Sequence, residues 1–109
     1  MNREVKDADE GNPTNERANG MTRVRRLVLD VLKAHKPSVL EFGELLAGQH
    51  GLYAKLTVLE IDEKTETLRI EITGEDIDFQ RIRDAIDGFG ASLHSIDEVE
   101  VEGGTEPDD

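Results

Sequence analysis

The chain has 109 residues, of which 25 are acidic, 13 are basic and none is cysteine. The length suits a single domain, and the lack of cysteine excludes disulfides, thiol catalysis and cysteine-based metal sites. A net charge of −12 opposes binding to nucleic-acid phosphates. No apolar run approaches the roughly 20 residues of a membrane helix. We therefore expect a cytoplasmic protein without nucleic-acid or membrane partners.

Apolar side chains are concentrated in residues 21–102, which we expect to form the folded domain. Residues 1–20 hold almost no apolar side chains, so they are predicted to be a disordered extension that cannot bury a core. Residues 103–109 are acidic and contain glycine and proline, which predicts a frayed tail. Aromatic residues are scarce throughout, and the core must therefore be built from aliphatic side chains.

The first predicted strand spans residues 24–33 and carries apolar side chains on both of its faces. One face holds Leu27, Leu29 and Val31. The other face holds Arg26, Val28, Asp30 and Leu32. Because a strand at the edge of a sheet seldom needs two apolar faces, this pattern indicates a central strand.

A helix is predicted over residues 39–50, since Ser38 and Glu41 have the spacing of a capping box. The strand predicted next, over 52–62, alternates in polarity. Its face away from the helices is expected to carry Lys55, Thr57, Leu59 and Ile61.

A polar hairpin leads to the third predicted strand, residues 67–74, in which Leu68, Ile70 and Ile72 face the core. The second helix is predicted over 78–89, with Asp76 or Asp78 as its cap. The last strand is predicted over 91–101. This order, strand, helix, strand, strand, helix, strand, predicts an α+β fold with both helices on one face of an antiparallel sheet. The expected strand order is 4-1-3-2.

Several stretches resemble a family of small archaeal proteins, domain of unknown function 211. They are residues 25–33, 35–38, 60–62, 72–79 and the segment His-Ser-Ile-Asp-Glu-Val at 94–99. The resemblance covers about residues 22–101 and implies a ferredoxin-like βαββαβ two-layer sandwich that assembles into homo-oligomers. It implies no established activity. The low number of lysines, five, beside 25 acidic residues predicts a haloarchaeal member, because salt screens the self-repulsion of such a chain.

The candidate binding residues are Asp30, Arg69 and His94, which the expected strand order places on the open face of the sheet. A carboxylate in the middle of a central strand is costly to bury without a partner. Asp30 therefore needs His94, Arg26, Arg69, a second subunit or a cation beside it. A His–Asp pair can also perform general acid–base chemistry, although Ser95 would point away from His94 and no nucleophile is evident.

The candidate metal ligands are Asp97 and Glu98, which begin an acidic run in the last predicted strand. Carboxylate oxygens bind divalent cations such as calcium, but the run lacks the spacing of a calcium-binding loop. A solvated acidic edge that prevents unwanted strand pairing is the alternative.

Two functions fit these observations. In the first, the protein is a non-enzymatic homo-oligomer that responds to a small ligand or a cation, with another subunit covering the open face. That face is expected to carry Val28, Leu32, Leu59 and Ile61 beside Asp30. In the second, the protein is an enzyme whose acid/base site, Asp30 and His94, forms between subunits.

Overall fold

The computed structural model describes residues 22–48 and 51–104. The predicted extension over residues 1–20, most of the predicted tail and the predicted helix end at His50 lie outside the described residues. Residues 24–100 form one compact unit, and the arrangement described below is that of this unit. No helix in the described part of the chain has the length and apolar character needed to cross a membrane.

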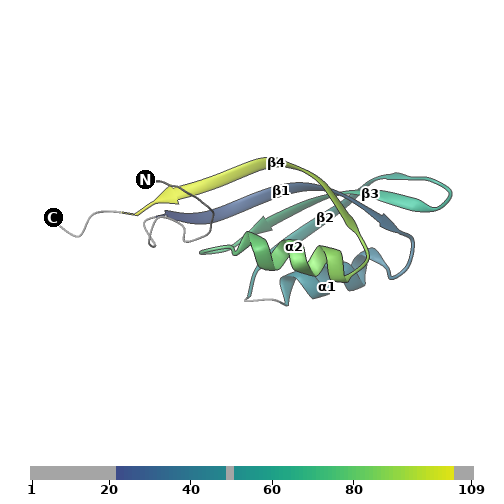
Figure 1. Ribbon diagram of the computed structural model, residues 1–109, viewed down its shortest axis with the longest axis horizontal. Helices are drawn as coiled ribbons and strands as arrows, with labels where there is room; N and C mark the ends of the chain where they lie inside the picture. The colour runs from purple at the N-terminus through teal and green to yellow at the C-terminus, as the bar shows by residue number, and fades with distance from the viewer. Residues whose placement is uncertain (1–21, 49–50, 105–109) are drawn as a thin grey trace, which may run out of the picture. The chain divides into compact units, whose positions relative to one another are not determined.

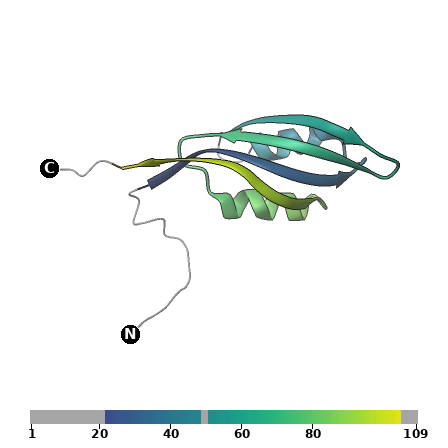
Figure 2. The same ribbon diagram turned by 90° about the horizontal axis from the view of Figure 1, so that it is seen from above.

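The structure contains the predicted series of elements (Figure 1). They are β1 (Thr22–Ala34), α1 (Val39–Ala47), β2 (Tyr53–Ile61), β3 (Thr65–Thr73), α2 (Phe79–Gly88) and β4 (Ser92–Gly103). Both helices lie on the same face of the sheet, as the view from above also shows (Figure 2). The fold is therefore α+β, with a covered face and an open face.

The four strands form one sheet in the order β2-β3-β1-β4. The predicted series 4-1-3-2 is written from the β4 edge and has the same neighbours, with β1 between β3 and β4. β1 pairs antiparallel with β3, and β3 pairs antiparallel with β2. This order is compatible with a ferredoxin-like sandwich.

The core lies between the sheet and the helices and is almost entirely aliphatic. The inward apolar side chains of β1 and β3 are at most 2% exposed, namely Leu27, Leu29, Val31, Leu68, Ile70 and Ile72. They pack against Phe42 and Leu46 of α1 and Ile82 and Ile86 of α2, all of which are buried. Phe42 also stacks on Phe89, with ring centroids 4.3 Å apart.

The prediction that Ile61 lies on the open face of the sheet is wrong. The register of β2 shifts between Val58 and Glu60, so Val58 lies opposite Leu68 whereas Ile61 lies opposite Glu66. Because Leu68 and Glu66 share the helix-covered face of β3, Ile61 is turned to that side and not to the open face. An extra residue in a strand inverts the alternation beyond it, and the polarity pattern of β2 does not reveal such an insertion.

Both helices begin at predicted caps. The Ser38 hydroxyl accepts a hydrogen bond from the Glu41 backbone N–H at 3.1 Å, and the Ser38 backbone N–H donates to Glu41 Oε1 at 2.9 Å. At the second helix the cap is Asp78 and not Asp76, since Asp78 accepts from the backbone N–H groups of Gln80 and Arg81.

Replacing the first of these caps tests its contribution. Ser38→Ala leaves the backbone N–H of Glu41 without its acceptor, and we expect a loss of about 1 kcal/mol in the free energy of unfolding. Urea denaturation in high salt measures this loss. Ser92→Ala, at an exposed serine of β4, is the matched control and is expected to change the free energy by less than about 0.5 kcal/mol. Equal effects of the two variants would contradict a capping role for Ser38.

Candidate functional site

The open face of the sheet brings Asp30, Arg69 and His94 together from three adjacent strands. Asp30 of β1 is paired in register with Arg69 of β3. From the other side, His94 Nδ1 of β4 lies 3.9 Å from Asp30 Oδ2. The side chains of Asp30 and His94 are 31% and 51% exposed, so the carboxylate stays in contact with solvent and is not in the aliphatic core. The sequence-predicted grouping is therefore present.

Arg26 has carboxylate neighbours other than Asp30. Its guanidinium donates to Glu71 Oε1 at 2.9 Å and lies 3.5 Å from both Glu98 and Glu100. The hydrogen bond from Arg26 is the largest cause that holds the pKa of Glu71 below its usual value. Arg26 thus ties β1 to β3 and β4, and it leaves Arg69 and His94 as the basic neighbours of Asp30.

A shallow hollow of about 290 Å³ lies beside this ion-pair group on the open face. Arg26, Val28, Arg69 and Glu71 line it together with residues 97–98 of β4. Its walls are mostly charged and carry both signs. A hollow of this kind suits a small polar molecule with separated charges better than an apolar one.

The two predicted metal ligands do not converge. Glu98 contacts Arg26, whereas Asp97 accepts a hydrogen bond from the Ser95 hydroxyl at 2.6 Å. Neighbouring residues of a strand point to opposite faces, so these two carboxylates leave β4 in opposite directions. Within residues 22–48 and 51–104 no group of three or more histidine, cysteine, aspartate or glutamate side chains is arranged to hold a metal ion.

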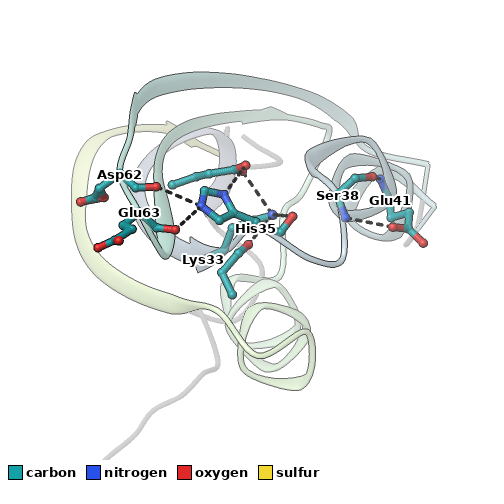
Figure 3. A network of polar contacts seen from close by, with 8 residues as sticks. Lys33, His35, Ser38, Glu41, Asp62 and Glu63 are labelled. Atoms are coloured by element: carbon teal, nitrogen blue, oxygen red, sulfur yellow. Dashed lines mark hydrogen bonds and ion pairs between the residues drawn. The ribbon is translucent and has the colours of Figure 1, made fainter.

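A second polar group, at the far end of β1, was not predicted. Lys33 lies on the helix-covered face and is 3% exposed. Its ammonium donates to the backbone carbonyls of Ala34 and His35, at 2.6 and 3.2 Å, and to Glu66 Oε1 at 3.2 Å (Figure 3). An ammonium group has three N–H donors, so each has an acceptor and the buried charge is compensated.

His35 completes this group (Figure 3). Its Nδ1 lies 3.2 Å from Glu66 Oε2, and its Nε2 lies 2.9 and 3.1 Å from the backbone carbonyls of Asp62 and Glu63. Carbonyl and carboxylate oxygens only accept hydrogen bonds, so both ring nitrogens must donate. Only the charged imidazolium can therefore donate a proton from each ring nitrogen to the Glu66 carboxylate and the two backbone carbonyls.

The Lys33–His35–Glu66 cluster shifts the titration of two of its members. The hydrogen bond to Glu66 is the largest cause that raises the pKa of His35, and the two carbonyls act in the same direction. The same bond from His35, followed by that from Lys33, lowers the pKa of Glu66. Because Asp62 and Glu63 belong to the turn between β2 and β3, the cluster fastens this hairpin to the end of β1. The N–H groups of Lys33 and His35 donate to oxygens of the same chain, which indicates a structural role for the cluster.

The meeting of Lys33 and Glu66 could have been predicted from the sequence. Lys33 continues the buried series Leu27, Leu29, Val31, and Glu66 precedes the buried series of β3 by the same spacing of two. Two opposite charges on the core face of paired strands are expected to meet. His35 follows the end of β1, where no periodic pattern indicates its direction.

Protonation of His35 gives a testable pH dependence. Its pKa is raised above the ordinary value of 6.5, so its stabilising effect is complete below that pH and is lost as pH rises through the higher folded-state value. NMR titration of the ring protons is expected to give a pKa above 6.5 for His35. The His35→Gln variant should lose this part of the decline in stability above pH 6.5, whereas His94→Gln should retain it. A His35 pKa at or below 6.5 would contradict the assignment.

Removal of the shared carboxylate tests the compensation of Lys33. Glu66→Gln leaves a buried ammonium without its counter-charge, and we expect the free energy of unfolding to fall by about 2–3 kcal/mol. Glu63→Gln, at an exposed side chain of the same hairpin, is the control and should be nearly neutral. Chemical denaturation at neutral pH measures both. If Glu66→Gln left the free energy of unfolding unchanged, Lys33 would not depend on this carboxylate.

Comparison with known proteins gives two findings. The family model DUF211, described as "Uncharacterized ArCR", matches residues 25–105. The uncharacterised protein MJ0319 of Methanocaldococcus jannaschii is 39% identical over 80 residues, which cover 72% of this chain and 82% of that protein. The relative is archaeal. The region that the family model matches includes most of β1 and the open-face residues Asp30, Arg69 and His94.

Proposed function

We propose that this chain, which belongs to the DUF211 family, is a non-enzymatic protein whose copies associate through the open face of the sheet. The observation that carries the proposal is the composition of this face. Its centre holds opposite charges, and around them Leu59 and Ile96 are about half exposed. The helices of the described chain lie on the other face (Figures 1 and 2), so a second copy would cover these side chains.

The charges of this face are complementary to themselves. Arg69 is exposed, and within the described residues its guanidinium forms no ion pair, while the ion pair of its register partner Asp30 is with His94 at 3.9 Å. In a two-fold contact each surface meets its own copy. The partner's Arg69 can then approach Asp30, and each copy supplies the cation that the other lacks.

Such a contact would make the assembly sensitive to small solutes. The cluster of Asp30, Arg69 and His94 beside the charged hollow offers a place for a small ligand that carries both charges. Carboxylates of two associated copies can together offer oxygens to a divalent cation such as calcium, which those described in one copy do not. Either would compete with or strengthen the ion pairs between copies. The composition, with 25 acidic residues and a net charge of −12, supports a haloarchaeal, cytoplasmic setting in which salt screens the repulsion between copies.

A second candidate function is an enzyme that acts between subunits. It is favoured by the proximity of His94 Nδ1 to Asp30 Oδ2, which lie 3.9 Å apart, so that a shift of about 1 Å would let the carboxylate accept a hydrogen bond and orient the histidine for proton transfer. A nucleophile would have to come from the substrate or from the partner copy. The first function requires no such addition and is therefore preferred.

The oligomeric state of two matched variants tests the proposal. Ile96 and Val99 both belong to β4 and are 49% and 50% exposed, but they lie on opposite faces of the sheet. Ile96→Asp is expected to abolish association through the open face, whereas Val99→Asp should leave it intact. Light scattering coupled to size exclusion in molar salt measures the mass. If Ile96→Asp retained the mass of the unaltered protein, the open face would not be the contact.

A further inference from the structure

We infer that the β2 edge of the sheet, with α1 beside it, is a second contact surface and that its occupant is the β2 edge of another copy of this chain. This surface is separate from the centre of the open face. The inference rests on the charge of the two sheet edges, on where apolar side chains are exposed, and on the register shift in β2.

The two edges of the sheet differ in charge. β4 carries Asp97, Glu98, Glu100 and Glu102, all of one sign. A run of like charges prevents an edge strand from pairing with a copy of itself. β2 carries one base, Lys55, and one acid, Glu60, in nine residues. In a chain with a net charge of −12, β2 is therefore an edge strand without this protection.

Exposed apolar side chains gather at the same edge. Nine large apolar side chains of the described residues are more than a third exposed, and six of them belong to β2 and α1. These six are Leu40, Leu45, Tyr53, Val58, Leu59 and Ile61. Leu40 and Tyr53 are the most exposed, at 68% and 67%. Pairing along β2 would remove much of this surface from water.

A groove between α1 and β2 provides room for a partner. Its volume is about 420 Å³, and its walls include the small residues Gly43, Ala47 and Ala54, with Leu40 at the rim. In a two-fold arrangement that joins the two β2 strands, α1 of one copy lies beside α1 of the other. The exposed Leu40 of each copy can then enter the groove of its partner.

The register shift makes β2 complementary to itself. Lys55 lies opposite Glu71 and Glu60 lies opposite Thr67, so both charged side chains are on the open face. Without the shift they would be on opposite faces, because their separation in sequence is odd. When two copies of β2 run antiparallel about Thr57, Lys55 of each copy lies opposite Glu60 of the other. On the helix-covered face the same alignment sets Leu56 opposite Val58 and Ala54 opposite Ile61.

Charge reversal tests this pairing in the Ile96→Asp background, which removes the open-face contact. Lys55→Glu places two acids opposite each other, and Glu60→Lys places two bases opposite each other. Each single change is expected to weaken self-association roughly tenfold, because two favourable pairs per dimer become unfavourable. Equilibrium sedimentation at about 0.15 M salt, where the screening length is about 8 Å, measures the association, because molar salt would screen these charge pairs. An equimolar mixture of the two variants restores both opposite-charge pairs and should associate as well as the parent.

The outcomes separate this inference from the proposed function. If the Ile96→Asp protein is monomeric over the whole concentration range, or if the mixture does not recover association, the β2 contact is refuted and the open-face proposal stands. If Ile96→Asp has no effect on mass while the charge reversals dissociate the protein, the open-face proposal fails and the β2 contact stands.

Discussion

The pairing of β1 on both of its edges is the constraint from which the other features of the molecule follow. β1 lies between β3 and β4, and its side chains must therefore be accommodated on both faces. On the helix side Leu27, Leu29 and Val31 supply the aliphatic layer against which α1 and α2 pack. On the other side Asp30 is held between residues of two neighbouring strands. The strict alternation of a strand links these two facts, since a shift of one residue would exchange the core and the charged cluster.

The sequence was sufficient to predict the element order, the sheet order and the open-face cluster. These depend on regular alternation and on short-range cap signals, which the apolar residues of β1 and β3 and the Ser38–Glu41 pair display clearly. The face of Ile61 was predicted wrongly because a single inserted residue in β2 reverses the pattern without a change in composition. His35 was missed because its direction is set by tertiary contacts with the β2–β3 turn. Asp97 and Glu98 are adjacent in sequence, and the alternation that separates them could have been applied.

The charged residues of the described chain differ in sign and number between the two edges of the sheet. The acids of β4 lie along one edge of the sheet, and three carboxylates from two strands surround Arg26. The β2 edge carries one charge of each sign, and Lys33 is the one buried charged side chain among residues 22–48 and 51–104. The run of acids along β4 discourages pairing of that edge strand with another. In contrast, the β2 side of the sheet carries one base and one acid in nine residues.

The burial of Lys33 has a consequence for the chemical reactivity of the protein. Acylating reagents attack a neutral amine, and the Lys33 ammonium is shielded from solvent and donates to three oxygens. Lys36, Lys55 and Lys64 are exposed and have no such shielding. Mild acetylation would therefore mark these three amines while sparing Lys33 as long as the hairpin remains attached to β1. The appearance of a modified Lys33 in a peptide map would therefore report opening at this end of the sheet.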